Sequence, residues 1–106
     1  MKKSIYYRAC IKQNNFIFKE DTGYIINFYN GTAAVDLVFA KNQFNLWTIT
    51  ELTTGFLAYN ETFLTRKEAI NAITSDHLKK IIDQMKHPRF IEAVERLTES
   101  RAKNQA

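Results

Sequence analysis

Apolar and polar positions alternate along the front of the chain in the way that is typical of β-strands. A period of two runs through residues 5–12 and predicts a strand with one wetter face, and residues 16–19 predict a short strand that ends at Glu20-Asp21-Thr22-Gly23. Residues 24–29 and 32–40 are rich in aromatic and β-branched side chains, and only Asn30-Gly31 separates them. A two-residue turn needs positive φ at both positions, which Asn and Gly tolerate best. We therefore expect a tight β-hairpin at Asn30-Gly31.

The same pattern predicts further strands before any helix begins. Residues 44–50 and 56–60 are again rich in apolar and β-branched side chains, and turns are expected at 41–43 and 51–55. Each of the 3 glycines falls in a predicted turn, so the local signals agree with one another. We expect an antiparallel sheet of four to five strands.

From Thr65 the apolar period changes from two to about 3.6, which indicates helices. Thr65-Arg66-Lys67-Glu68 fits the capping box that opens a helix. Thr74-Ser75-Asp76 are poor helix-interior residues and allow a break there, and Pro88 suits the first position of a new helix. The fold class predicted is α+β, in which the sheet precedes two C-terminal helices. The chain is expected to form a single domain over 1–106, β-rich in 1–63 and helical in 65–102.

Both faces of the central strands carry apolar side chains. Tyr24, Ile26 and Phe28 point one way, whereas Ile25 and Tyr29 point the other. A solvated face would need fewer apolar side chains than this. We expect either that helices cover both faces or that one aromatic face is an interface with a partner or with a second copy of the chain.

Composition narrows the class of protein. The chain has 106 residues, of which 45% are apolar and 25% charged, as in ordinary folded domains. Its apolar runs are shorter than the roughly 18 residues of a membrane-spanning helix, and its basic start is interrupted by charge before a signal core forms. A lone cysteine, Cys10, excludes an internal disulfide framework. We expect a cytoplasmic protein with no membrane contact.

The residues that carry catalytic chemistry are scattered. Cys10, His77 and His87 lie far apart in the sequence, so no metal-ligand spacing is present. Glu20-Asp21 are neighbours, and neighbouring carboxylates do not converge on one reacting atom. No glycine-rich phosphate loop or nucleophile-elbow motif occurs. We predict that the protein is not an enzyme and has no metal or cofactor; an enzyme built around His77 ranks last.

Charge divides the chain into three zones. Residues 1–19 hold five bases and no acid, residues 20–65 hold five acids and one base, and residues 66–106 hold nine bases and six acids. The net charge of +4 is therefore a basic start and a basic end around an acidic middle. This asymmetry suggests which part of the molecule meets which kind of partner.

The first functional hypothesis is a non-enzymatic binding protein. Interfaces favour aromatic residues at the centre and charges at the rim. An acidic, aromatic sheet face would oppose a basic surface on another protein or on a nucleoprotein complex. The candidate protein-binding residues are Tyr24, Tyr29, Asp36, Trp47, Glu51, Tyr59 and Glu61.

The alternative is a small DNA-binding accessory or regulatory protein. Its bases would come from the amino-terminal arm and from the helical region, where acids such as Asp76 and Asp83 are interspersed. The candidate nucleic-acid-binding residues are Lys2, Lys3, Arg8, Lys12, Lys79, Lys80, Lys86 and Arg89.

Two resemblances bear on these hypotheses. The stretch from Trp47 to Ile73 resembles the sheet-plus-helix modules at the amino ends of some tyrosine recombinases, in which a Trp-containing strand leads through a Gly turn into a start such as Thr65-Arg66-Lys67-Glu68-Ala69. That likeness implies a sheet that enters the major groove, although residues 24–60 supply Lys41 as their sole base. Trp47-Thr48-Ile49-Thr50-Glu51, Thr54-Gly55 and the same helix start also resemble small proteins of phages, plasmids and conjugative elements of Gram-positive bacteria. This second likeness implies inhibition by stoichiometric binding, as by anti-CRISPR or anti-restriction proteins.

Overall fold

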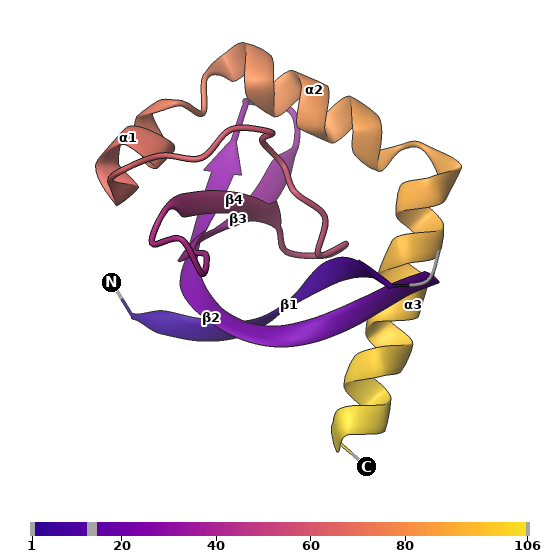
Figure 1. Ribbon diagram of the computed structural model, residues 1–106. Helices are drawn as coiled ribbons and strands as arrows, with labels where there is room; N and C mark the ends of the chain where they lie inside the picture. The colour runs from indigo at the N-terminus through magenta and orange to yellow at the C-terminus, as the bar shows by residue number, and fades with distance from the viewer. Residues whose placement is uncertain (1, 13–14, 106) are drawn as a thin grey trace.

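The computed structural model describes residues 2–12 and 15–105. One antiparallel sheet in the order β1-β2-β3-β4 precedes three helices, so the predicted α+β fold is confirmed (Figure 1). The elements are β1 (Lys3–Lys12), β2 (Asn15–Tyr29), β3 (Ala34–Lys41), β4 (Trp47–Glu51), α1 (Arg66–Asn71), α2 (Ser75–Met85) and α3 (Pro88–Gln105).

The helices begin at the residues that the sequence marks as caps. The Thr65 hydroxyl accepts a hydrogen bond from Glu68 N at 3.1 Å, and Thr74 Oγ1 accepts one from His77 N at 3.3 Å. The second cap divides the first helical stretch into α1 and α2, at the break that the run of poor helix formers allows. Pro88 is the first residue of α3, as expected.

Strand β2 is longer than the sequence suggests. The predicted break at 20–23 is wrong, because residues 15–24 pair without interruption with β1. Beyond that stretch, residues 24–29 pair with β3, so β2 connects two halves of the sheet. At the junction a Cβ on Gly23 would lie 2.6 Å from Val38 Cγ1, which means that glycine is needed for a close approach between strands rather than for a turn.

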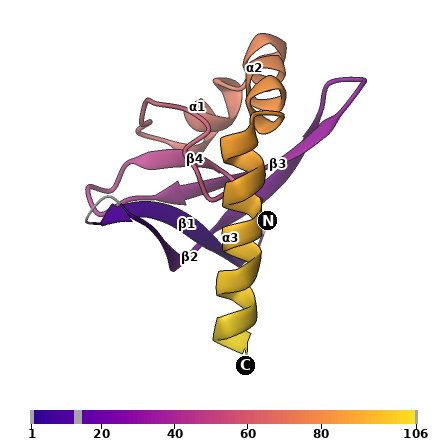
Figure 2. The same cartoon turned by 90° about the vertical axis from the view of Figure 1, so that its right-hand side faces the viewer.

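The hairpin at Asn30-Gly31 is confirmed, with a longer connection than two residues. The last pair of the ladder is Tyr29 with Ala34. Gly31 takes the positive φ of 94°, and Asn30 Oδ1 accepts from Thr32 N and Ala33 N, both at 2.9 Å. The Asn side chain therefore closes the turn by hydrogen bonding instead of adopting positive φ itself. Figure 2 shows this hairpin projecting away from the rest of the molecule.

The last part of the sheet is less regular than predicted. Asn42 Oδ1 accepts from Phe44 N and Leu46 N, so Phe44 belongs to a turn, and β4 begins only at Trp47. Residues 56–63 run beside β4 but form only isolated bridges, Trp47 with Phe63 and Thr50 with Leu57. The expected fifth strand is thus an irregular segment that crosses β4 and leads into α1.

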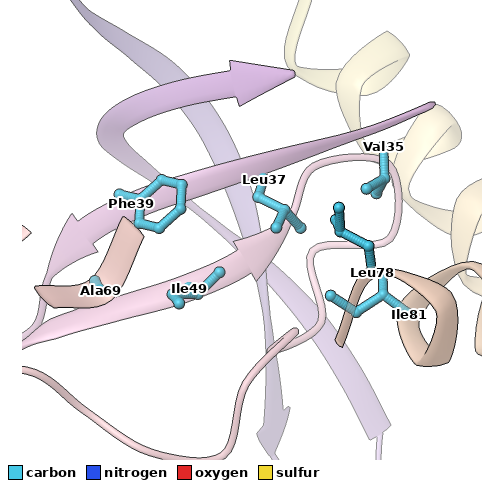
Figure 3. Packing of buried hydrophobic residues seen from close by; sticks show 7 residues of the cluster. All are labelled: Val35, Leu37, Phe39, Ile49, Ala69, Leu78 and Ile81. Carbon is cyan, nitrogen blue, oxygen red and sulfur yellow. The ribbon is translucent and has the colours of Figure 1, made fainter. Parts of the chain in front are cut away.

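The helices bury one face of the sheet. Figure 3 shows side chains from β3 and β4 packed against side chains from α1 and α2. Removing this apolar surface from water is the main stabilisation of the fold. The buried side chains of this helix-side core are Val35, Leu37, Phe39, Ile49, Ala69, Leu78 and Ile81.

The opposite face is buried by the chain's own first hairpin. β1 and β2 curve beneath β3 and β4 (Figure 1), and Tyr6 packs with Val38 and Ala40 in a second, smaller core. Ala9 N donates to Gly55 O at 2.7 Å, which ties β1 to the segment after β4. The curl of the sheet therefore accounts for the apolar side chains on this second face around Tyr6, Val38 and Ala40.

Candidate functional site

The four aromatic residues predicted to line one binding face lie in three different places. Tyr24 and Trp47 lie beside each other at one end of the sheet, with ring centroids 6.0 Å apart. Tyr29 is 67% exposed next to the hairpin tip. Tyr59 is half-buried against α2, with its ring 4.7 Å from that of His77. A single aromatic sheet face is therefore absent among these residues.

The three acids predicted for a rim are also separated. Glu51 is 1% exposed, and its carboxylate accepts from Thr54 N and Thr54 Oγ1, each at 2.7 Å, and from the amide and hydroxyl of Thr53. Its place on a rim is a wrong prediction, because this carboxylate holds the turn after β4 together. Asp36 is half-buried and accepts from Asn27 Nδ2 at 2.9 Å, and Glu61 is exposed beside α2.

Three cations lie around Tyr24 and Trp47, in contrast to the acidic, aromatic sheet face that was expected. The Arg66 guanidinium lies 4.3 Å from the Tyr24 ring centroid and 5.9 Å from that of Trp47. Lys3 Nζ lies 5.9 Å from the Tyr24 centroid, and Lys41 Nζ lies 5.5 Å from the Trp47 centroid. Each separation falls within about 6 Å, the reach of a cation–π interaction.

Strand register and helix docking bring these residues together. Lys3 is the cross-strand partner of Tyr24, and Lys41 is that of Trp47, so each cation sits directly opposite a ring. The bridge between Trp47 and Phe63 brings the chain back to this end of the sheet just before α1, whose first residue is Arg66. We call Lys3, Tyr24, Lys41, Trp47, Arg66 and Lys67 the cation–aromatic edge.

The cations of the edge outnumber the acid beside them, because Asp21 is the one acid that lines the adjoining hollow with Lys3 and Lys41. Lys67 joins Trp47 and Arg66 in lining a shallow hollow of about 420 Å³. Among the side chains that the structure describes, those of residues 2–10 and 17–99, none of the four bases of the edge forms a salt bridge. The edge therefore presents four positive charges around two rings, which attracts an anionic partner that has flat groups.

Sequence reasoning missed three of these bases, Lys41, Arg66 and Lys67. Charge was counted along the chain, where Lys41 stands alone among acids and Arg66 belongs to a capping motif. The usable signal was the hairpin register, which sets a residue at the end of one strand opposite the start of the next. No pattern in the sequence indicates that Arg66 lies near Tyr24 and Trp47, because only the docking of α1 places it over their rings.

The bases predicted for nucleic-acid binding divide into two groups. Lys3 belongs to the edge and Lys2 directly precedes it in the chain, whereas Arg8 Nε lies 3.3 Å from Asp21 Oδ2 and Lys12 ends β1. The helical bases lie elsewhere, and Figure 1 shows α3 on the opposite side of the molecule from α1 and the N-terminus. These exposed helical bases are Lys79, Lys80, Lys86 and Arg89.

A second hollow lies on the concave side of the curled sheet, and we call it the concave pocket. It has a volume of about 430 Å³ and is lined by Tyr6, Arg8, Lys19, Lys41 and Phe44 among others. Burial, together with the negative charge of Asp21, raises the pKa of Tyr6 above its ordinary value of 10.0. The Tyr6 side chain is thus a neutral hydroxyl at physiological pH.

The residues weighed for catalytic chemistry, His77 and Cys10, contact their neighbours in the fold. The Nδ1 atom of His77 and the Thr74 hydroxyl are hydrogen-bonded at 2.9 Å at the start of α2, and the imidazole lies over Tyr59. Cys10 is half-buried on β1. In the described part of the chain, no three His, Cys, Asp or Glu residues lie close enough together to hold a metal ion.

None of the helices in the described residues is both long and apolar enough to cross a bilayer. No protein-family model, curated protein or solved structure matches this chain. The function is therefore inferred from the geometry of the candidate site.

Proposed function

We propose that this chain is a non-enzymatic binding protein that binds nucleic acid through the cation–aromatic edge. The observation that carries the proposal is the convergence of Lys3, Lys41 and Arg66 on the adjacent rings of Tyr24 and Trp47. Phosphates contribute most of the affinity in such complexes through contacts with Lys and Arg, and aromatic and guanidinium planes contribute stacking against bases.

The proposal keeps one half of the predicted DNA-binding surface. Lys3 belongs to the edge and Lys2 directly precedes it in the chain, while the bases of α2 and α3 do not contribute to the edge. The shortage of basic residues in 24–60 no longer argues against nucleic-acid binding, because β1 and α1 supply cations to the same end of the sheet. Neighbours across the sheet, rather than neighbours in the sequence, set the local charge.

The test is the salt dependence of binding to fluorescein-labelled duplex and single-stranded oligonucleotides of random sequence. Removing one phosphate-binding cation should reduce the log–log slope by about 0.9 for duplex or 0.7 for a single strand. We expect Lys41→Gln and Arg66→Gln to weaken binding and flatten the slope, and the matched control Lys79→Gln on α2 to change neither. Equal effects of all three variants would show that binding is not located at the edge.

Arg66 also joins α1 to the sheet, so its variant needs a folding control. Arg66→Lys keeps the charge but loses the planar stack. We expect it to retain the slope with some loss of affinity, whereas Arg66→Gln loses both. Circular dichroism and urea denaturation on the same samples separate a binding defect from unfolding.

A second candidate function is inhibition of a larger protein machine, and our specific candidate for its target is a host defence nuclease. The projecting β2–β3 hairpin favours it (Figure 2). Between Tyr24 and Phe39 the one charged residue is Asp36, and Tyr29 is 67% exposed near the tip. A projection with a single charge and an exposed aromatic side chain is typical of an interface centre.

Tyr29→Ala tests this second candidate. Proteins that co-purify from host cells with the wild-type chain are identified, and the affinity of each is then measured for the wild type and the variant by calorimetry. If Tyr29 is an anchor of the interface, its replacement by Ala should weaken the binding free energy by about 2 kcal/mol, which raises Kd about thirtyfold. An unchanged Kd for every partner would remove the hairpin tip as a contact surface.

A further inference from the structure

The concave pocket is a second cationic site, separate from the rings of the edge. Its lining includes the bases Arg8, Lys19 and Lys41 and the one acid Asp21. We propose that this pocket holds one nucleotide of a single strand, with the phosphate among these bases and the nucleobase against Phe44. The inference rests on the proposed function and narrows it from nucleic acid to single-stranded nucleic acid.

Strand pairing builds the charge of the pocket. Arg8 is the cross-strand partner of Lys19, and Tyr6 is that of Asp21, so these four side chains share the concave face. Arg8 Nε lies 3.3 Å from Asp21 Oδ2 in an ion pair, which orients the guanidinium. Lys19 and Lys41 have no salt bridge in the described part of the chain, and they leave the pocket with a net positive charge. A phosphate group suits this arrangement.

The floor of the pocket is polar but uncharged. Thr48 and Thr50 from β4 line it beside Tyr6. The Thr48 hydroxyl donates to Ala40 O at 3.0 Å, and Thr50 is 2% exposed. No acid other than Asp21 lines the pocket among the described residues, so an entering phosphate meets little repulsion. A volume of about 430 Å³ lies within the range of small-ligand sites.

Phe44 supplies a stacking surface at the mouth. Its side chain is 72% exposed, and it has no ring or cation partner in the described residues, unlike Tyr24 and Trp47. The turn that presents it is well ordered by hydrogen bonds, because Asn42 N donates to Leu46 O at 2.8 Å and Asn45 N to Asn42 O at 3.0 Å. An exposed aromatic ring on a hydrogen-bonded turn suits stacking of a base.

Lys41 connects the pocket with the edge, because it lines the pocket while its Nζ lies over Trp47. A strand that crosses the edge thus reaches the pocket without a break in positive charge. A base must leave the duplex stack before it lies flat on a side-chain ring. The pocket and Phe44 therefore favour a single strand over a duplex.

The test compares a labelled twelve-nucleotide oligo-dT with a duplex of the same length. Lys19→Gln and Phe44→Ala change residues of the pocket alone, and Lys80→Gln on α2 is the matched control. We expect Phe44→Ala to weaken oligo-dT binding about tenfold, within the range expected for removing one base stack. Lys19→Gln should also weaken oligo-dT binding and reduce the log–log salt slope by about 0.7, because it removes one phosphate contact. Both variants should change duplex binding less than twofold. Both side chains are exposed, so these variants should remain folded. Unchanged oligo-dT affinity in both would overturn the inference.

A titration with thymidine monophosphate, followed by NMR, separates this inference from the proposed function. Chemical-shift changes of the amides of Lys19, Phe44 and Thr48 that disappear in Phe44→Ala would support binding in the pocket. This support would hold even if Arg66→Gln left oligonucleotide binding unchanged, a result that would reject the edge as the binding site. If instead Arg66→Gln weakens oligonucleotide binding while the nucleotide causes no shifts at the pocket, the edge stands and the pocket inference is wrong.

Discussion

The two faces of the sheet are both buried, but by different means. On the helix-side face, Leu37, Phe39 and Ile49 are fully buried beneath α1 and α2. On the concave face, Tyr6 packs with Val38 and Ala40 under the chain's own first hairpin, and this smaller core lies beside the charged concave pocket. The helix-side face stabilises the fold, whereas the concave face both stabilises the fold and contains a candidate binding site.

This difference teaches that an apolar strand face need not predict an external partner. Packed helices exclude water over a whole face, whereas a curled hairpin covers only part of one. The uncovered remainder of the concave face carries Arg8 and Lys19, and Lys41 lines the same pocket from the end of β3. These bases were too far apart in the sequence to be recognised as one site. The following predictions test whether the two faces are as separate as the structure indicates.

The largest effect is expected on the helix-side face. Phe39 is 0% exposed and packs with Phe28 at a centroid distance of 6.1 Å. Phe39→Ala should lower the free energy of unfolding by about 3–5 kcal/mol, because it removes apolar packing and leaves a cavity. Urea denaturation measures this loss. A cost below about 1 kcal/mol would mean that the helices do not pack closely on this face.

The next effect concerns the tie between β1 and the segment after β4. Gly55 has a φ of 73°, and a Cβ there would lie 2.6 Å from the carbonyl oxygen of Tyr7. Gly55→Ala should lower the free energy of unfolding by about 2–3 kcal/mol, because the added Cβ strains the turn and moves β1 away from β4. The same movement should weaken oligo-dT binding. Gly31→Ala is the matched control: it also has positive φ, 94°, but open space around it. Equal losses of oligo-dT affinity would show that the curl does not shape the pocket.

A somewhat smaller effect is expected at Glu51. Glu51→Gln keeps the shape of the side chain but places an amide group, which donates, against the amides and hydroxyls of Thr53 and Thr54. The unsatisfied buried donor should lower the free energy of unfolding by about 2 kcal/mol. Thermal and urea unfolding measure this loss. Glu61→Gln, at an exposed acid, is the control and should be neutral. A neutral Glu51→Gln would show that the turn does not need the carboxylate.

The smallest effect at neutral pH is expected at Tyr6, whose pKa burial raises above 10.0. Above pH 10 the unfolded chain releases this proton while the folded chain keeps it, so stability is present below that pH and is lost as pH rises. The wild type should therefore lose up to about 1.4 kcal/mol per pH unit more than Tyr6→Phe. Unfolding curves between neutral and strongly alkaline pH measure the difference. Parallel curves would indicate that the Tyr6 hydroxyl is hydrated.

The sequence by itself determined that a sheet precedes the helices, where the helices begin and where one hairpin lies. Each of these features depends on residues that lie close together in the sequence. They are the change of apolar period at Thr65, the helix caps at Thr65 and Thr74, and the hairpin at Asn30-Gly31. Such local signals act before any tertiary contact exists, so they can be recognised in a single sequence. The proposed partners are not determined in this way and stay predictions.

Only the tertiary structure decided where the charges meet. Pairing with β1 carries β2 through the predicted break at 20–23, the strand register sets Lys3 and Lys41 opposite Tyr24 and Trp47, and the docking of α1 brings Arg66 over both rings. These contacts join residues from distant parts of the chain, and a shift of one residue in register would move each side chain to the other face. Local propensity contains no information on such a register, which is why the candidate site emerged only from the fold.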